Sequence, residues 1–372
     1  MTKATQPYST WVEVDLDAVR ENVRIIKELT TSEIMAVVKA NAYGHGFIPV
    51  AKAAVEAGAS WCGLARPGMA TALREAGLDC KMLILGYFPP ERITEMLEHS
   101  ISLTAWTEAH LQQISAAAER TGLQANVHIL TDTGMGRLGC HPEKTLELVK
   151  MAVAYPRLNV EGLLSHLAKA DDVDPTTTEQ QEAVFRGVIG NLDQADLLPP
   201  YIHMANSAGS LGFPSTHFNL IRPGIVLYGM PPAPEAPLPA GIRPALTWKT
   251  VLASVKVLPP KHGVSYGHAY TTSSKETIGV LPLGYADGFR RTAGNQVLIH
   301  GKRVPVVGRV CMDQCMVQLD GIDNPQVGDE VVLIGRQGEE QITAEEIARN
   351  WGTINYEVTC GISARVSRIF FH

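Results

Sequence analysis

One lysine in this sequence stands where an amine could do covalent chemistry. Lys39 follows the apolar run Ile34–Val38 and precedes a segment with two glycines, Gly44 and Gly46. An apolar strand would carry the amine into a dry cavity, where burial lowers the pKa of a lysine and lets it form a Schiff base. A strand-end lysine that extends into solvent is the alternative interpretation. Because the glycines would leave room for a ligand, Lys39 is the first candidate catalytic residue.

Other polar side chains come at or after the ends of apolar runs. They are Arg137, His166, His203, Asn206, Ser207 and Arg222. Two loops of small residues, Ala205–Gly209 and Arg222–Ile225, could offer backbone N–H groups to an anion such as a phosphate. Two ordinary turns with glycine are the alternative. Polar residues gathered at the ends of several strands indicate an active site more strongly than any one of them.

Two further patterns point to sites that we do not expect. Gly134–Gly139 spells G-x-G-x-x-G after a predicted strand, which is the pattern of a dinucleotide-binding loop. No acidic residue ends a strand about 20 positions later, so a nicotinamide cofactor is not expected. The 12 histidines contain no H-x-x-x-H pair, and His45 has no second histidine or cysteine in its motif. We therefore expect no metal site.

The elements that must position these residues alternate between strand and helix patterns from residue 15 to about residue 240. The predicted helices include Pro67–Ala76 and Thr107–Thr121, each followed by a glycine. Eight β/α units without a reversal of strand order are typical of a TIM barrel, an α/β fold with its active site at the carboxyl ends of the strands. The predicted strands are Ile34–Lys39, Ser60–Ala65, Lys81–Leu85, Ile101–Thr104, Asn126–Thr131, Val160–His166, Tyr201–Ala205 and Phe218–Arg222.

After the proline-rich segment Pro231–Pro239 the pattern changes to short strands separated by turns. Such a segment is typical of a stiff connector between domains. We predict an N-terminal TIM-barrel domain over residues 1–240 and a C-terminal all-β domain over residues 241–372. The predicted strands of the second domain are Leu246–Val257, Thr277–Leu283, Gln296–Ile299, Val304–Met312 and Glu330–Ile334, with hairpin turns at Gly301–Arg303 and Gly335–Gly338.

Composition excludes several classes of protein. The 372 residues are 45% hydrophobic and 19% charged, which is typical of globular proteins and not of disordered or fibrous ones. The net charge of -6 and the lack of a basic block offer no electrostatic footprint for a phosphate backbone, so we expect no nucleic-acid partner. No run approaches the roughly 18 apolar residues of a membrane span, and the first residues do not resemble a secretion leader. Six cysteines without a C-x-x-C pair favour reduced thiols. We expect a cytoplasmic protein.

Several segments together carry a resemblance to one known family. They are Ala36–Gly46, Asp132–Gly139, Asn206–Ser207, Ile221–Ile225, Val264–Gly267, Leu281–Gly288, Cys311–Gln314 and Thr353–Val358. They resemble the motifs of alanine racemases, which are pyridoxal-phosphate enzymes of fold type III, and the resemblance covers nearly the whole chain. It implies a barrel and a β domain, with a first strand near residues 10–14 that joins the β domain. It also implies interconversion of L- and D-alanine, which supplies D-alanine for peptidoglycan, in a homodimer with shared active sites.

The resemblance implies two bases for the reaction. Lys39 would hold pyridoxal 5'-phosphate and act as one base, and Tyr266, contributed by the second subunit, would act from the opposite face. Inversion at Cα needs removal of a proton from one face and delivery to the other. The cofactor takes up the carbanion charge. A tyrosine with a pKa near 10 needs cationic neighbours for this role, and His166 and Arg222 resemble the family's supporting network. Because a guanidinium has no acceptor, Arg222 would leave the pyridine nitrogen of the cofactor unprotonated.

The resemblance also implies the residues that bind the cofactor phosphate and the substrate. The implied phosphate contacts are Tyr43, Ser207, Gly224, Ile225 and Tyr356, with Asn206 adjacent. The implied anchors of the substrate carboxylate are Arg137 and, from the second subunit, the backbone near Met312. The residues that match the family's entry corridor are Asp171, Tyr285, Arg290 and Arg309.

One residue departs from the family pattern. Leu130 occupies a place where many members carry a carbamylated lysine that holds the substrate-binding arginine. A leucine cannot form a carbamate, so Arg137 needs chloride, water or a carboxylate as a partner, because a buried unpaired guanidinium is costly. We therefore predict that bicarbonate does not stimulate the activity.

Three alternatives stay open from the sequence. A racemase of broader specificity, or one for serine or basic amino acids, would have the same fold, because one methylene changes discrimination by only about 1 to 3 kcal/mol. A decarboxylase of the same cofactor fold would lack Val264–Gly267 in this form. A non-catalytic carrier of the cofactor would consist of the barrel alone, without the domain that contains Tyr266 and Tyr356.

Overall fold

The computed structural model describes residues 7–234 and 236–372. The described chain divides into two compact units, and each is described by itself. The barrel unit comprises residues 17–42 and 47–244. Of the described residues, the β unit comprises residues 7–16, Tyr43–Gly46 and Ala245–His372. The β unit is therefore assembled from three parts of the sequence, which a single boundary at residue 240 does not describe.

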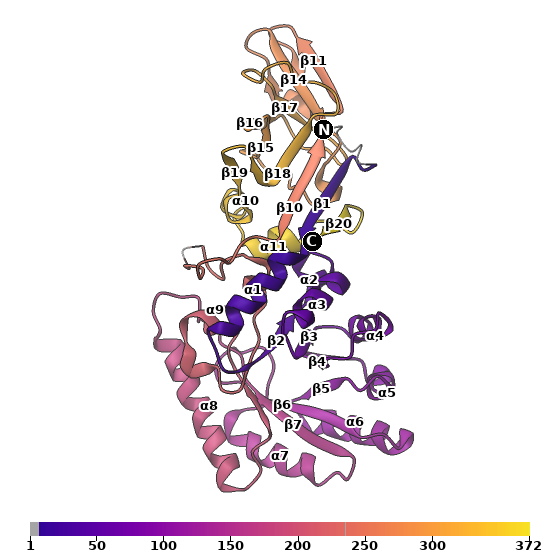
Figure 1. Ribbon diagram of the computed structural model, residues 1–372, viewed down its shortest axis with the longest axis vertical. Coiled ribbons are helices and arrows are strands. Elements are labelled where there is room, and N and C mark those ends of the chain that lie inside the picture. Colours follow the sequence, from indigo (N-terminus) through magenta and orange to yellow (C-terminus); the bar gives the residue numbers. More distant parts are fainter. Residues whose placement is uncertain (1–6, 235) are drawn as a thin grey trace. The chain divides into compact units, whose positions relative to one another are not determined.

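Eight parallel strands form the sheet of the barrel unit, in the order β8-β7-β6-β5-β4-β3-β2-β9. They are β2 (Glu33–Val37), β3 (Trp61–Leu64), β4 (Lys81–Ile84), β5 (Ser102–Ala105), β6 (Ala125–Leu130), β7 (Leu158–Leu164), β8 (Tyr201–His203) and β9 (Leu220–Ile221). Figure 1 labels β2 to β7 of this sheet. The two ends of the sheet meet through backbone hydrogen bonds from Asn219 to Ile202 (3.4 Å) and from Arg222 to Ala205 (3.0 Å), so the barrel is nearly closed. The predicted TIM-barrel fold and its eight strands are confirmed.

Helices connect the barrel strands, and local sequence explains where several begin and end. Pro67 occupies the first turn of α4, where its missing N–H costs nothing. The Thr107 hydroxyl caps α6 by accepting a hydrogen bond from the His110 N–H (3.2 Å), and Gly122, with a φ of 73°, ends it. The helices are α1 (Leu16–Glu28), α2 (Lys39–Tyr43), α3 (Phe47–Glu56), α4 (Pro67–Glu75), α5 (Ile93–Glu98), α6 (Glu108–Thr121), α7 (Thr145–Val153), α8 (Thr176–Gln194) and α9 (Ser207–Gly212), with 3-10 turns η1 (Pro90–Arg92), η2 (Pro142–Lys144), η3 (Pro214–Thr216) and η4 (Ile225–Tyr228).

The interior of the barrel contains both an apolar cluster and buried polar groups. Met35, Trp61, Leu83 and Leu220 pack together and are fully buried. The ring of buried His128 lies 5.3 Å from that of Trp61, between centroids. Polar groups removed from water need hydrogen-bond partners. The buried side chains of His128, His203 and Glu161 find them in one another.

The β unit contains a ten-stranded sheet, in the order β11-β14-β17-β16-β15-β18-β10-β1-β20, with β19 paired to β18. The first strand, β1, runs antiparallel to β10 and parallel to β20, so residues 10–15 belong to this sheet, as the resemblance implied. The strands are β1 (Thr10–Asp15), β10 (Leu246–Val251), β11 (Ser254–Leu258), β14 (Glu276–Leu281), β15 (Gln296–Ile299), β16 (Lys302–Val307), β17 (Cys315–Gln318), β18 (Glu330–Gln337), β19 (Glu340–Ile342) and β20 (Ser367–Phe371), and a separate pair consists of β12 (Gly263–Val264) and β13 (Tyr270–Thr271).

Four short helical segments of the β unit were not predicted from the sequence. They are α10 (Ala344–Trp351), α11 (Asn355–Cys360), η5 (Tyr266–His268) and η6 (Tyr285–Asp287). Across residues 7–234 and 236–372, no helix is both long and apolar enough to cross a membrane.

Several strand boundaries in the β unit differ from the prediction, and β12, β13, β17, β19 and β20 were not predicted. Two of the differences have a clear structural cause. The predicted strand Leu246–Val257 is two strands, because β10 pairs with β1 and β18 whereas β11 pairs with β14. The predicted strand from Val304 ends at Val307, because the next residue, Gly308, has a φ of 70°, outside the strand region. The predicted turn at Gly301–Arg303 is wrong by about one residue, because the hairpin between β15 and β16 turns at His300 and Gly301, whose φ values of 51° and 73° suit a two-residue loop with both central residues left-handed. The predicted turn at Gly335–Gly338 is also misplaced, because β18 continues to Gln337 and pairs there with β19.

Candidate active site

Lys39 lies just beyond the carboxyl end of β2, at the start of an unusual turn. Ala40, Asn41, Ala42 and Tyr43 have φ values of 51°, 56°, 52° and 52°, so four consecutive residues other than glycine are left-handed. Each such residue costs roughly 1–2 kcal/mol relative to the right-handed form. The Asn41 side chain helps to hold the turn by accepting a hydrogen bond from the N–H of Phe47 (3.0 Å). Strain of this kind persists where function requires it, which supports the choice of Lys39 from the sequence.

Arg222 follows β9 and is buried, with a relative exposure of 4%. Its Nη1 donates to Nδ1 of His203 (2.9 Å). Its Nη2 donates to the carbonyl oxygens of Ser165 (2.7 Å) and Met204 (3.1 Å) and lies 3.1 Å from Nδ1 of His166. Burial, together with the charge of Arg137, lowers the pKa of Arg222 to about 9, so the guanidinium still carries its charge at neutral pH. The result is a fixed cation at the carboxyl ends of the barrel strands.

His166 follows β7 and stands beside this cation. Burial first, and then the charges of Arg222, Arg137 and Lys39, hold the pKa of His166 well below its usual range. The imidazole is therefore neutral at pH 7. A guanidinium has no acceptor, so Nδ1 of His166 must accept from Arg222 and the ring proton must be on Nε2. Lys39, Arg137 and Arg222 thus form one electropositive group around the neutral ring of His166 in the barrel unit.

Two loops beside Arg222 offer backbone N–H groups to an anion. The Ser207 hydroxyl accepts a hydrogen bond from the N–H of Gly224 (2.8 Å), which joins the loop after β8 to the loop after β9. Asn206 caps α9 by accepting from the N–H of Gly209 (3.0 Å). Ser207 and Ile225 begin α9 and η4, and the first N–H groups of a helix have no acceptor within it. These loops, identified from the sequence as small-residue loops, could hold a phosphate.

Arg137 lies in a loop that Asp132 organises. The Asp132 carboxylate accepts hydrogen bonds from the N–H groups of Gly134 (3.0 Å), Met135 (2.8 Å) and Gly136 (3.0 and 3.1 Å to its two oxygens). The glycines of the G-x-G-x-x-G pattern therefore wrap this carboxylate, which accounts for them without a dinucleotide. Arg137 itself is exposed, and it makes no hydrogen bond or ion pair within the described chain. Leu130, the last residue of β6, is buried and offers it no acceptor.

Tyr43 and Tyr356 come together in the β unit. Their ring centroids lie 5.8 Å apart, and burial, with Tyr356 as a second cause, raises the pKa of Tyr43. Tyr43 therefore keeps its hydroxyl proton and can donate it. Gly44 allows this approach, because a Cβ at its position would lie 2.0 Å from the carbonyl oxygen of Thr359. The Arg368 guanidinium also donates from Nε to the carbonyl of Gly44 (3.1 Å).

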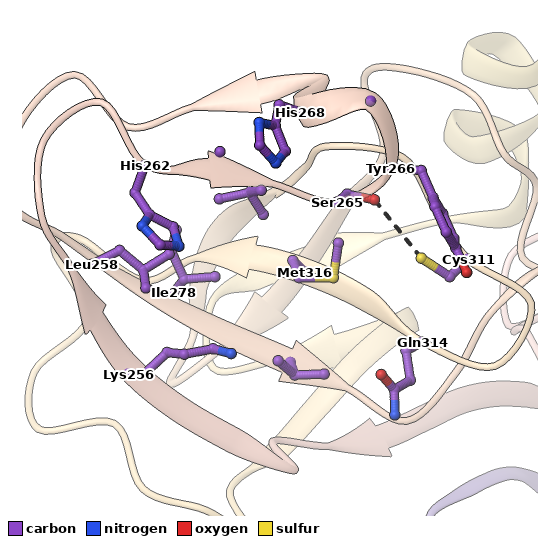
Figure 2. Close-up of a pocket in the computed structure, with 14 residues that line it drawn as sticks. Lys256, Leu258, His262, Ser265, Tyr266, His268, Ile278, Cys311, Gln314 and Met316 are labelled. Carbon is purple, nitrogen blue, oxygen red and sulfur yellow. Dashed lines mark hydrogen bonds between the residues drawn. The ribbon is translucent and has the colours of Figure 1, made fainter.

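Tyr266 stands on an exposed turn of the β unit, and 64% of it is exposed. Ser265, the residue before it, has a φ of 66° and a ψ of -179°, a conformation that is normally reserved for glycine. The Ser265 hydroxyl donates to the carbonyl of Arg309 (2.6 Å) and so holds the turn. Figure 2 shows Tyr266 and Cys311 at one end of a cavity of about 530 Å³, with Lys256 and His262 at the other.

The loops that contain Tyr285 and Met312 are joined by backbone hydrogen bonds and by ion pairs of Arg365, which the sequence analysis did not identify. The N–H groups of Tyr285 and Ala286 donate to the carbonyls of Cys311 and Met312 (both 3.0 Å). The buried Asp287 carboxylate accepts from the N–H of Gly284 (2.8 Å) and from Nε of Arg365 (2.7 Å).

Arg365 also donates to Asp313 (2.5 Å), so one guanidinium connects the two loops. Asp287 is visible only as part of the Leu281–Gly288 motif, and nothing in the sequence singles out Arg365.

The four corridor residues lie in both units. Asp171 is exposed in the loop after β7 of the barrel unit. Arg290 in the β unit pairs with Glu357 (2.6 Å) and lies over the ring of Trp351 at 5.3 Å. Tyr285 and Arg309 are exposed. Their grouping into one corridor stays a prediction.

Comparison with known proteins identifies the family. The model of the alanine racemase N-terminal domain matches residues 14–232, and that of the alanine racemase C-terminal domain matches residues 245–370. The chain is 43% identical to the alanine racemase of Methanococcus maripaludis, over 97% of this chain and 98% of that protein. It is 44% identical to that of Geobacillus stearothermophilus, over 97% and 93%.

Solved structures agree with the sequence relatives. The alanine racemase of Bacillus anthracis with bound L-Ala-P superimposes with a TM-score of 0.93 at 40% identity, covering 99% of this chain and 96% of that one. The alanine racemase of Streptomyces coelicolor gives a TM-score of 0.94 at 42% identity, covering 98% of each chain. The likeness extends over both units, and the chain belongs to the alanine racemase family of amino-acid isomerases.

Proposed function

We propose that this chain interconverts L- and D-alanine with bound pyridoxal 5'-phosphate, using Lys39 and Tyr266 as bases on opposite faces of the substrate. Membership of the alanine racemase family supports the reaction. The observation that carries the proposal is the electropositive group of Lys39, Arg137 and Arg222 around neutral His166, together with two loops at which α9 and η4 begin. An amine, a buried cation and an anion cradle are what a phosphorylated pyridine aldehyde needs.

The residues of the chain fit this cofactor. Ser207 and Ile225 would hold its phosphate, because α9 and η4 begin there with N–H groups that lack helical acceptors. Gly224 would lie against the same phosphate, and its N–H, bonded to the Ser207 hydroxyl, joins the two loops. The hydroxyls of Tyr43 and Tyr356 would add O–H donors. Arg222 would donate to the pyridine nitrogen and keep it unprotonated, because a guanidinium cannot accept a proton. When bound, the cofactor withdraws electrons from the substrate and makes its Cα proton acidic.

The two bases divide the proton transfer between them. The amine of Lys39 takes or gives the Cα proton on one face, and the hydroxyl of Tyr266 does so on the other, since inversion requires both. Tyr266 is largely exposed in the single chain, which supports a role in the site of a second subunit. We therefore propose a homodimer with shared active sites.

Substrate positioning falls to Arg137 and to the backbone near Met312. Arg137 is exposed on a loop organised by Asp132, and the carboxylate of alanine would be its charge partner. Met312, 54% exposed, would act from the second subunit. Six cysteines without a C-x-x-C pair support a reducing, cytoplasmic location, where D-alanine would feed peptidoglycan synthesis.

Proton exchange at Cα tests the proposal directly. Purified protein loaded with pyridoxal 5'-phosphate is mixed with L-alanine in D2O and followed by proton NMR and chiral chromatography. We expect loss of the α-proton signal together with D-alanine. Exchange with retained configuration would support Lys39 and remove Tyr266 or the dimer from the mechanism. No exchange with alanine, but exchange with serine or lysine, would replace alanine as the substrate.

A further inference from the structure

A chain of hydrogen bonds crosses the interior of the barrel and ends at Arg222. Arg222 donates from Nη1 to Nδ1 of His203 (2.9 Å). Nε2 of His203 lies 2.9 Å from Nδ1 of His128, and Nε2 of His128 lies 3.3 Å from Oε2 of Glu161. All four residues are buried, with relative exposures of 6% or less. They come from β6, β7, β8 and the end of β9, so the chain connects four strands of the barrel.

The two ends of this chain fix the position of every proton in it. A guanidinium only donates hydrogen bonds and a carboxylate only accepts them. His203 must therefore accept at Nδ1 and carry its proton on Nε2, which faces His128. His128 must in turn accept at Nδ1 and donate from Nε2 to Glu161. Both rings are neutral and every bond points from Arg222 to Glu161.

The electrostatics of the barrel agree with this assignment. Burial lowers the pKa of both His128 and His203, so neither ring is charged at neutral pH. Burial alone would raise the pKa of Glu161, but hydrogen bonds from His128 and Ser102 lower it to about 2. Glu161 is thus ionised throughout the physiological range.

Arg222 needs this remote charge. It makes no ion pair with any carboxylate in residues 7–234 and 236–372. Its remaining acceptors are neutral carbonyl oxygens and His166. A buried cation without a counter-charge is strongly unfavourable, and hydrogen bonds in series polarise one another. Glu161 supplies the negative end of the series.

We propose that Glu161 is a positioning residue for Arg222, acting through His128 and His203. Its carboxylate keeps Nδ1 of His203 unprotonated, and that nitrogen holds the guanidinium in place and oriented. The inference rests on the proposed contact between Arg222 and the pyridine nitrogen of the cofactor. It adds a group to the machinery that touches neither substrate nor cofactor.

The substitution Glu161→Gln should reverse the direction of the hydrogen bonds from Arg222 to residue 161, because Lys81 would fix the orientation of the introduced amide. Lys81 donates to Oε1 of Glu161 (3.1 Å), whereas Ser102 (2.5 Å) and His128 bond to Oε2. An ammonium group only donates, so the oxygen of the introduced amide would turn to Lys81 and its NH2 to His128. His128 would then accept at Nε2 and carry its proton on Nδ1. His203 would present an N–H to Arg222, which also donates.

Removing Lys81 from this variant should restore the original direction. In Lys81→Met the carboxylate of Glu161 still accepts from His128, so nothing changes in the series. In the double variant Lys81→Met with Glu161→Gln, the amide oxygen is free to face His128 and Ser102. Lys81 is nearly half exposed, so its loss should be tolerated.

Ring nitrogen NMR tests the proposal on the full chain, both with and without pyridoxal 5'-phosphate. Long-range proton–nitrogen spectra of histidine-labelled protein distinguish the two neutral ring forms and the charged form. In the wild type between pH 6 and 8, we expect His128 and His203 to be neutral with the proton on Nε2. In Glu161→Gln we expect both protons on Nδ1, an altered absorption spectrum of the bound cofactor and about tenfold weaker cofactor binding. Lys81→Met should match the wild type, and the double variant should recover the wild-type ring forms.

Three results would overturn the proposal. One is a ring proton on Nδ1, or a charged ring, at His128 or His203 of the wild type, which needs no variant to fold. Another is Glu161→Gln with wild-type ring forms and cofactor spectrum. Reversed ring forms with unchanged cofactor affinity would show that the series exists but does not position Arg222. Failure of the wild type to bind pyridoxal 5'-phosphate would instead overturn the proposed function, and the ring forms without cofactor would still be readable.

Discussion

The barrel unit and the β unit hold their site residues in different ways. In the barrel, Arg222 is 4% exposed and is bonded to groups from β7 and β8 and the residues that follow them. In the β unit, Tyr266 and Met312 are 64% and 54% exposed. Their positions depend on the backbone of short turns, at Ser265 and Gly308, and on the bridge made by Arg365. The candidate site residues of the barrel unit are oriented by burial, and those of the β unit by turns and surface charges.

This difference predicts two kinds of failure on mutation. Changes in the barrel should alter how the cofactor is held, because its polar residues are fixed by many partners at once. Changes in the β unit should leave the cofactor in place and alter turnover or substrate binding. The following experiments test this division, beginning with the largest expected effect.

Replacing Lys39 with alanine should abolish covalent attachment of the cofactor. We expect turnover of L-alanine to fall by at least about 10³-fold, since both the nucleophile and one base are lost. Racemisation rates and the visible absorption of the bound cofactor measure the effect. Lys52→Ala, an exposed lysine of α3, is the matched control and should behave as the wild type. A Lys39 variant with near-normal turnover would contradict the assignment.

Replacing Tyr266 with phenylalanine should lower turnover without loss of the cofactor, which is the effect expected of a change in the β unit. Turnover should fall about 10²-fold or more and become unequal for the two enantiomers, because only one face loses its base. Cofactor occupancy should stay at the wild-type level. Tyr87→Phe, which changes another exposed tyrosine, serves as the control. Unchanged turnover would show that Tyr266 is not a base. Loss of the cofactor would contradict the expectation that changes in the β unit leave cofactor binding intact.

Replacing Arg365 with glutamine should loosen the two loops around Met312. Arg365 bonds to both Asp287 and Asp313 but is itself nearly half exposed, so solvent screens the interaction. We expect the KM for alanine to rise about threefold with little change in kcat. Lys302→Gln breaks a similarly exposed pair with Asp323 and should leave KM unchanged. A fall in kcat alone would argue against a role in holding the substrate-binding backbone.

Bicarbonate should have no effect on the reaction. Leu130 cannot carry a carbamate, so the position of Arg137 does not depend on dissolved carbon dioxide. Initial rates in degassed buffer, with and without added bicarbonate at matched ionic strength and pH, measure the effect. Clear stimulation would contradict the alignment of Leu130 with the carbamylated lysine of other members.

Much of the fold follows from local patterns in the sequence. The barrel strands and the ends of α4 and α6 are predictable, because apolar runs, Pro67, Gly77 and Gly122 act on their own neighbourhood. The β unit was less predictable. The break between β10 and β11 depends on which strand each segment pairs with, and the sequence does not show this. The helix α10 lies in a region where the sequence pattern predicted only strands.

Candidate site residues were predictable where a motif or a strand end marked them. Lys39, His166, Ser207 and Arg222 stand at the carboxyl ends of strands that the alternation of elements already indicates. Arg365 carries no such mark, because its importance comes from two carboxylates, 78 and 52 positions away in the chain. Tyr266 was indicated by family resemblance alone, since an exposed turn has no hydrophobic periodicity to place it.

The sequence by itself determined the order of the elements, the residues at the strand ends and the family. These depend on short-range patterns of apolar side chains, on turn residues and on motifs, all of which are written along the chain. Only the tertiary structure decided that Glu161 serves Arg222 through His128 and His203. His128 lies 33 positions from Glu161 and 75 from His203, and whether such residues meet depends on strand register and on which side chains face the barrel interior. A closed sheet fixes both at once, and the charges at the two ends then fix the protons.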